Sequence, residues 1–239
     1  MTIRALIFDR DGVLTDFDVE AATRFFQPLL PFSVWELAQE WQRFGERHGF
    51  PTSLAAERTF FAAFWDELAA QHHLAEEARR RLHALDYTQF VRAYPDAAPA
   101  LRLARQAGYR IGVLSNFSLA SLDASLAAAG LDDLVDATCA ATVIGAAKPD
   151  RAAYEIAALA LNVAPHECYF FDDEWLCVEG AMASGMQAWL VDRRRRCPAQ
   201  ITNVIPDLSA IAALLHSPSC PIRSVVARQV NESCVTSHL

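Results

Sequence analysis

Hydrophobic residues along the chain fall into short runs that stop at polar or turn-forming residues, with amphipathic stretches between them. Short apolar runs of this kind are typical of buried strands. We expect strands at 3–8, 110–114, 168–171 and 187–191, and a weaker one at 134–143. The stretches between them predict helices at 97–107, 118–129, 151–162 and 178–184. This alternation predicts an α/β fold, a Rossmann-like doubly wound parallel sheet with helices on both faces.

Residues 17–93 interrupt the alternation, because they show helical patterns and no convincing strand. The segment 33–36 carries a capping-box signature, Ser-x-x-Glu, and apolar residues follow it at helical spacing. We therefore predict an all-helical cap domain inserted into the sheet domain, which would comprise 1–16 and 94–216. Residues 217–239 lack periodicity and are expected to form a flexible tail.

Composition limits the functions that fit the chain. Of its 239 residues 53% are hydrophobic, yet no apolar run approaches the length of a membrane span. The net charge of −8 argues against nucleic-acid binding, which depends on basic surface. We expect the local exception, the arginine run 193–196, to be a solvated turn. The chain starts without a signal-peptide pattern, so we expect a cytoplasmic protein with no membrane partner. A monomer or a homodimer is expected.

Polar residues that can carry chemistry follow three of the predicted strands. Asp9 and Asp11 come after the first, Ser115 and Asn116 after the run at 110–114, and the acidic triplet 172–174 after the run at 168–171. Ligands of open α/β sheets bind beyond the carboxyl ends of the strands, so these side chains should gather at one edge. Acidic groups that lie close together repel one another, and a divalent cation relieves the repulsion. Oxygen ligands with room for water and phosphate favour Mg²⁺.

Lys148 is the only lysine in the chain, and every other basic residue is an arginine. It stands just before the helix expected at 151–162, so it should lie at the same edge of the sheet. Chance would explain a single lysine unless the site needs it.

Four motifs, in order along the chain, resemble those of the haloacid dehalogenase superfamily of phosphohydrolases. They read DRDGVLTD, VLSN, KPD and FFDDEWLCVEGAMASGM, and they fall within residues 1–193. The resemblance is to the branch that carries a helical cap after the first motif. It implies a Mg²⁺-dependent phosphohydrolase that acts on a small phosphorylated metabolite through an aspartyl-phosphate intermediate.

The resemblance also implies roles for the first motif. Asp9 would be the nucleophile that forms the aspartyl phosphate. Asp11 would be the general acid for the leaving alkoxide and then the base for the hydrolytic water, and its backbone carbonyl would bind Mg²⁺. Gly12 would permit the turn that places Asp11.

The other motifs would supply the remaining groups. Ser115 and the backbone at Asn116 would hold the phosphoryl oxygens. Lys148 would bridge the nucleophile and the phosphate and stabilise negative charge in the transition state. Asp173 would bind Mg²⁺ directly, with Asp172 beside it or acting through water.

Two positions depart from the family pattern, and three alternative functions stay open. Glu174 stands where a small hydroxyl or amide residue is common, and Cys177 where Asn or Asp is common, so the outer metal shell differs. A haloacid dehalogenase of the same fold is one alternative, although a halide leaves without a proton and needs no acid at Asp11. A sugar phosphomutase is a second alternative, although no basic cluster is obvious in the expected cap. The third is a non-catalytic binding protein, although no nucleophile or metal ligand is missing.

Overall fold

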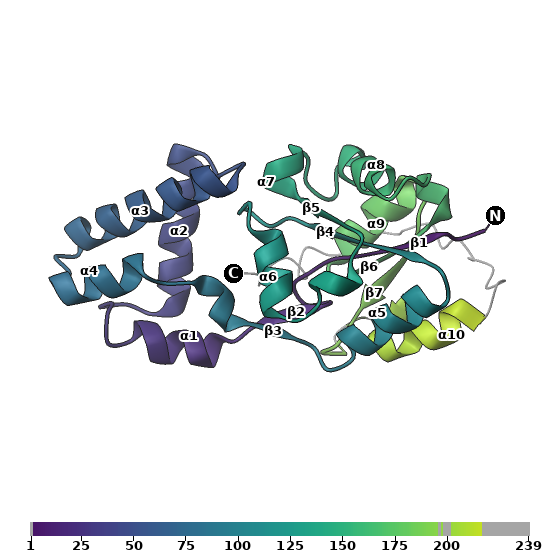
Figure 1. Ribbon diagram of the computed structural model, residues 1–239, viewed down its shortest axis with the longest axis horizontal. Coiled ribbons are helices and arrows are strands. Elements are labelled where there is room, and N and C mark those ends of the chain that lie inside the picture. Colours follow the sequence, from purple (N-terminus) through teal and green to yellow (C-terminus); the bar gives the residue numbers. More distant parts are fainter. Residues whose placement is uncertain (1, 196, 198–201, 217–239) are drawn as a thin grey trace.

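A six-stranded parallel sheet forms the centre of the computed structural model, which describes residues 2–195, 197 and 202–216. The tail expected at 217–239 lies outside the described residues. The strands pair in the order β5-β4-β1-β6-β7-β8, and every neighbouring pair is parallel. Their bounds are β1 Ala5–Phe8, β4 Arg110–Ser115, β5 Ala137–Ala140, β6 Cys168–Asp172, β7 Gln187–Val191 and β8 Val204–Ile205. β1 therefore lies between β4 and β6 (Figure 1).

Helices cover both faces of this sheet, which confirms the predicted α/β fold. One face carries α5 (Ala97–Gln106), α6 (Leu122–Ala128) and α10 (Ile211–His216), and the other carries α8 (Arg151–Ala160) and α9 (Trp175–Ala183). In β1, Leu6 and Phe8 belong to the first core, and Ala5 and Ile7 belong to the second. A strand that is buried on both faces is a continuous apolar run, which is why its sequence is easy to recognise.

Short helices complete the sheet unit. They are η2 (Asp132–Leu134), α7 (Ala141–Ile144), η3 (Pro165–Glu167) and η4 (Leu208–Ala210). The strand expected at 134–143 is only the short β5, because the chain enters α7 directly after it. A short apolar run does not distinguish a strand from a helix by itself. Within the described part of the chain, no helix is both long and apolar enough to cross a membrane.

The segment between β2 (Thr15–Phe17) and β3 (Val91–Ala93) folds as a separate group of helices, which we call the helical insert. It contains α1 Val19–Phe26, α2 Val34–His48, α3 Leu54–Gln71, α4 Glu76–His83 and η1 Tyr87–Phe90. The predicted capping box begins α2, because Ser33 accepts the backbone N–H of Glu36 and the Glu36 carboxylate accepts that of Ser33. The helical insert has its own core, which includes Phe26 and Phe64, and it lies beside the sheet in Figure 1.

The two chain crossings between the sheet and the helical insert form a small antiparallel ribbon. In it, Thr15 of β2 lies opposite Ala93 of β3, and Phe17 lies opposite Val91. The expectation that residues 17–93 contain no strand is therefore wrong for β3. Strands of three residues are too short to show periodicity, so neither is recognisable before its partner is known. The ribbon keeps the two ends of the helical insert side by side.

A buried carboxylate of the helical insert reaches the sheet unit. Glu57 in α3 is 7% exposed and accepts the backbone N–H groups of Ala120 and Ser121 at 2.7 and 2.9 Å. The Ser121 hydroxyl donates to the other Glu57 oxygen at 2.5 Å and lies 2.7 Å from the hydroxyl of Tyr87. Glu57 thus supplies acceptors that backbone N–H groups at a helix start lack. The helix α6 begins just after this contact, later than the start expected at 118.

We predict that Glu57→Gln weakens the contact between the helical insert and the sheet unit. The amide keeps the size of the side chain but loses one acceptor oxygen, so a buried donor loses its partner. Such a loss lowers the free energy of unfolding by about 1–3 kcal/mol, which urea denaturation would measure.

Glu20→Gln is the matched control for this experiment. The Glu20 side chain is 85% exposed and pairs with Arg24 on the surface of α1. Its replacement should change the free energy of unfolding by less than about 0.5 kcal/mol. Equal stability of the two variants would contradict the role given to Glu57.

Candidate active site

Parallel pairing brings the carboxyl ends of three neighbouring strands, and three predicted site residues, to one edge of the sheet. Asp9 directly follows β1, and its backbone N–H donates to the carbonyl of Phe171 in β6 at 2.8 Å. Asp172 is the last residue of β6 and Ser115 is the last residue of β4, and these two strands flank β1. Ser115 and Asp172 are both buried. Strands that pair in register thus place the three residues next to one another.

Lys148 lies between two of the acidic residues. Its Nζ donates to Oδ1 of Asp9 at 2.5 Å and to Oδ2 of Asp172 at 2.7 Å, and its side chain is 3% exposed. Asn116 fixes the backbone of this lysine: its Oδ1 accepts the Lys148 N–H at 2.7 Å, and its Nδ2 donates to the Lys148 carbonyl at 2.9 Å. The residues after β4 therefore position the lysine that binds the residues after β1 and β6.

Burial changes the proton affinities of this group. Desolvation is the main reason that the pKa of Asp9 rises from its ordinary 3.8 to about 8; Lys148 opposes the rise, while the charges of Asp172 and Asp11 add to it. Burial also raises the pKa of Asp172 against the attraction of Lys148. Burial alone would lower the pKa of Lys148, but Asp172 and Asp9 raise it overall, so the ammonium stays charged. The single positive charge of Lys148 therefore cannot neutralise the carboxylates of both Asp9 and Asp172.

The donor set fits a divalent cation. Asp9, Asp172 and Asp173 each offer a carboxylate oxygen, and these oxygens lie within 4.8 Å of one another. Asp172 already accepts hydrogen bonds at both of its oxygens, from Lys148 and from the backbone N–H of Glu174 at 2.8 Å. It is therefore less available for direct coordination. Carboxylate oxygens are hard ligands, which suit Mg²⁺ better than a soft transition metal.

Gly12 lies directly against this group, and two constraints require a glycine there. Its φ is +76°, in the left-handed region that a residue with a Cβ rarely adopts. A Cβ at this position would also overlap the carboxylate of Asp173. The loop after β1 can therefore approach Asp173 only because residue 12 has no side chain.

Asp11 is held by a residue that sequence reasoning passed over. The guanidinium of Arg10 donates to Oδ2 of Asp11 through Nε, at 3.1 Å, and also through Nη2. Its Nη1 donates to the hydroxyl of Ser125 at 2.9 Å, and its Cζ lies 3.9 Å from the ring centroid of Phe117. Arg10 is 5% exposed, whereas the Asp11 side chain is 46% exposed. The one signal in the sequence that could have indicated this ion pair is the position of Arg10 between two aspartates at the end of a strand.

The two departures from the family pattern contact each other. The Cys177 thiol is buried and donates to Oε2 of Glu174 at 3.4 Å. Burial is the main reason that its pKa is raised, with Asp172 adding to the rise, so the thiol stays neutral. Glu174 thus holds Asp172 through its backbone and Cys177 through its side chain. Neither residue belongs to the carboxylate group of Asp9, Asp172 and Asp173.

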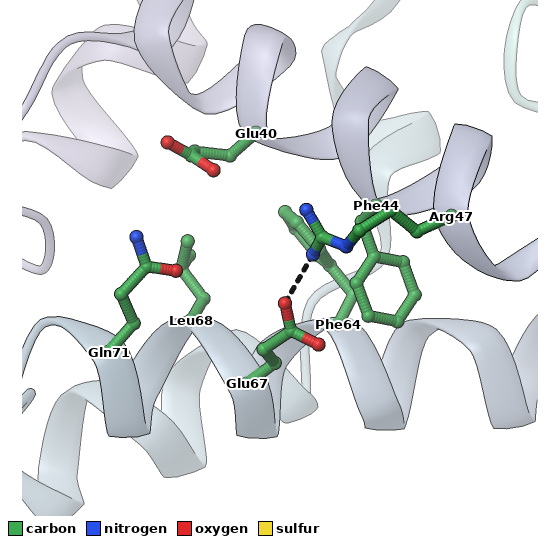
Figure 2. A pocket seen from close by; sticks show the side chains of 7 residues that line it. All are labelled: Glu40, Phe44, Arg47, Phe64, Glu67, Leu68 and Gln71. Carbon is green, nitrogen blue, oxygen red and sulfur yellow. Dashed lines mark hydrogen bonds and ion pairs between the residues drawn. The ribbon is translucent and has the colours of Figure 1, made fainter.

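A small hollow on the helical insert contains none of the predicted site residues (Figure 2). It lies between α2 and α3 and is lined by Glu40, Phe44, Arg47, Phe64, Glu67, Leu68 and Gln71. An ion pair joins Arg47 to Glu67 across it. Its volume of about 10 Å³ has room for one water molecule and is too small for a metabolite.

Comparison with known proteins shows which family the chain resembles. The chain matches the family model of haloacid dehalogenase-like hydrolases over residues 3–185. Phosphatase MT3486 of Mycobacterium tuberculosis (strain CDC 1551 / Oshkosh) is 40% identical over 221 residues, which cover 90% of this chain and 98% of that protein. (S)-2-haloacid dehalogenase 4A of Burkholderia cepacia is 27% identical over 222 residues, which cover 90% and 95% of the two chains.

A solved structure agrees with these matches. The crystal structure of a dehalogenase has a TM-score of 0.64 to this chain at 26% identity, and it covers 89% of this chain and 96% of its own. The family model matches the helical insert and the strands β1, β4, β5 and β6 of the sheet. The chain therefore belongs to the haloacid dehalogenase-like hydrolase family, and it is a hydrolase.

Proposed function

We propose that this hydrolase is a Mg²⁺-dependent phosphatase that acts on a small phosphorylated metabolite through an aspartyl phosphate on Asp9. The observation that carries the proposal is the buried group in which Lys148 lies between Asp9 and Asp172, with Asp173 close by. A phosphate monoester brings further negative charge to the site. A nucleophile that is itself anionic can approach it only where cations offset that charge.

Asp9 and Asp11 would share the chemistry. In the first step an oxygen of Asp9 attacks phosphorus, the bond from phosphorus to the leaving oxygen breaks, and Asp11 gives that oxygen a proton. In the second step water attacks phosphorus, Asp11 takes a proton from the water, and Asp9 leaves as a carboxylate. Asp11 is near enough to Asp9 that its charge helps to raise the pKa of Asp9.

Asp11 also favours a phosphatase over a dehalogenase. Both kinds of activity occur in the names of similar proteins, a phosphatase at 40% identity and a dehalogenase at 27%. A halide leaves without a proton, so a dehalogenase has no need of an acid two residues after its nucleophile. An alkoxide needs a proton, which Asp11 would supply.

The neighbouring residues would bind and orient the phosphoryl group. Lys148 would stabilise charge shared between Asp9 and the phosphoryl oxygens, and Ser115 with the backbone at Asn116 would bind those oxygens. Asp9, Asp173 and the carbonyl of Asp11 would hold Mg²⁺, with Asp172 beside them. When bound, Mg²⁺ supplies positive charge that offsets the phosphoryl oxygens and the carboxylates.

The helical insert would act as a cap over the site. Its Glu57 and Tyr87 contact the loop before α6, close to the residues that hold Asp11. A cap in this position excludes water and admits small substrates, so we propose a small phosphorylated metabolite rather than a polymer. The direct test is a screen of phosphorylated metabolites with Mg²⁺, each assayed again in excess chelator. Release of halide from 2-haloacids without release of phosphate from any ester would overturn the proposal.

We predict that Asp11→Asn slows the hydrolysis of alkyl phosphates more than that of p-nitrophenyl phosphate. Nitrophenolate leaves without help, but an alkoxide needs the proton of Asp11. Because positioned acid catalysis contributes about 10²–10⁴-fold, the alkyl ester should lose rate by roughly that factor. Steady-state kcat on both esters measures it. Equal losses on the two esters would assign Asp11 a different main role.

The Mg²⁺ affinities of two alanine variants test whether Asp173 or Asp172 is the direct metal ligand. Asp173→Ala should weaken Mg²⁺ binding, measured by calorimetry, more than Asp172→Ala does, because both Asp172 oxygens already accept hydrogen bonds. The Mg²⁺ affinity of Asp173→Ala should be about 10- to 100-fold lower than that of Asp172→Ala. Similar affinities in the two variants would show that the direct ligand is wrongly assigned.

Lys148→Arg tests whether the single lysine is required. A compact ammonium fits between two carboxylates, whereas a planar guanidinium is wider and would displace one of them. Losing one preorganised contact of this kind costs about 10²–10³-fold in kcat. Arg151→Lys is the matched control, because the Arg151 side chain is 71% exposed. This substitution should leave kcat unchanged. Activity of Lys148→Arg within a few-fold of wild type would remove the lysine from the mechanism.

A further inference from the structure

The arginine run after β7 is not simply a solvated turn. Arg194 and Arg195 are exposed, as expected, and Arg196 lies outside the described residues. Arg193 differs from them, because its side chain is only 15% exposed and it turns back toward the loop that follows β1. A cation withdrawn from solvent in this way needs partners that replace its hydration.

Arg193 has such partners on every side of its guanidinium. Its Nε donates to the carbonyl of Gly12 at 3.0 Å, and its Nη2 donates to the carbonyl of Val13 at 2.6 Å. Its Nη1 donates to Oδ1 of Asp96 at 3.1 Å. Its Cζ lies 3.8 Å from the ring centroid of Tyr94. The planar fork of an arginine can satisfy these acceptors together, which a lysine cannot do.

These partners come from both connections between the sheet and the helical insert. Gly12 and Val13 precede β2, while Tyr94 and Asp96 follow β3. The backbone N–H of Tyr94 also donates to the carbonyl of Leu14 at 3.0 Å, so the two connections are joined directly as well. One guanidinium therefore ties the base of the β2–β3 ribbon to the end of β7.

The same contact reaches the candidate active site through Gly12. Gly12 follows Asp11 directly, and its Cα lies so close to Asp173 that a Cβ would overlap the Asp173 carboxylate. A shift of the Gly12 peptide would therefore move the carbonyl and side chain of Asp11 relative to Asp173. Arg193 holds the carbonyls of Gly12 and Val13, which limits such a shift.

We propose that Arg193 is a positioning residue for the active site. It fixes the loop that carries Asp11 and Gly12 against Asp173, and it does so at the point where the helical insert joins the sheet. Its effect on metal binding and on leaving groups rests on the proposed phosphatase function, whereas its hold on the loop does not. Such a partner of metal ligands changes metal affinity or activity by about 10- to 100-fold when it is removed.

Arg193→Gln tests the proposal, with Arg194→Gln as the matched control at the exposed neighbouring position. Hydrogen–deuterium exchange should be faster across residues 11–15 in Arg193→Gln than in the control. Mg²⁺ binding, measured by calorimetry, should be about 10- to 100-fold weaker. The kcat on an alkyl phosphate should fall more than that on p-nitrophenyl phosphate, because the acid at Asp11 is displaced. Arg194→Gln should match wild type in all of these measurements.

Wild-type exchange across 11–15 in Arg193→Gln would overturn the proposal. So would a loss of melting temperature that leaves Mg²⁺ affinity and the ratio of the two kcat values unchanged, since Arg193 would then serve stability alone. If Arg193→Gln does not fold, Arg193→Lys replaces it, because it keeps a cation for Asp96 but cannot reach both carbonyls, and the same outcomes apply. A wild-type protein that neither binds Mg²⁺ nor cleaves phosphate esters would refute the phosphatase, while the exchange comparison would still decide on Arg193.

Discussion

The rest of the site depends on the buried ammonium of Lys148 between the carboxylates of Asp9 and Asp172. Ionising both acids beside the ammonium is costly in this dry place, because each charge loses its hydration, and the raised pKa of Asp9 reflects that cost. The ammonium makes the arrangement tolerable by donating to both acids at 2.5 and 2.7 Å. The ammonium does not neutralise the charge of the whole group, since Asp173 adds a further carboxylate close by. In the proposed mechanism this remaining imbalance would attract a second cation to the carboxylates, beside the point where an incoming phosphate would meet Asp9.

Glycine and arginine at the base of the helical insert support the same group from outside. Gly12 allows the loop after β1 to touch Asp173. Arg193 binds that loop and the start of the segment after β3, so the ribbon that carries the helical insert and the loop that carries Asp11 share one anchor. Glu57 also joins the helical insert to the loop before α6. These two contacts join the helical insert to the loops that hold Asp11, and the proposed cap would need such a connection to the site.

The sequence was most informative where a pattern is local. β1, β4, β6 and β7 are apolar runs that end at polar residues, and parallel strands place those ends together, so the meeting of Asp9, Lys148 and Asp172 could be expected. The ribbon of β2 and β3 could not, because each strand has three residues and exists only through its partner. The buried contacts of Arg10, Glu57 and Arg193 could not be predicted for a related reason. Charged residues usually lie in solvent, and only the fold shows which of them are buried against a distant acceptor.

If Asp9 is the nucleophile, it forms an acyl phosphate during turnover, and borohydride can trap that intermediate. Borohydride reduces an aspartyl phosphate to homoserine but leaves a free carboxylate intact. Trypsin cuts after Arg4 and Arg10, so the peptide 5–10 contains Asp9 without Asp11. After quenching during turnover with Mg²⁺ and the best substrate of the screen, we predict homoserine at position 9 in this peptide, and none when substrate is omitted. Unmodified Asp9 in samples that release phosphate at full rate, with homoserine at another aspartate or nowhere, would rule out Asp9 as the nucleophile.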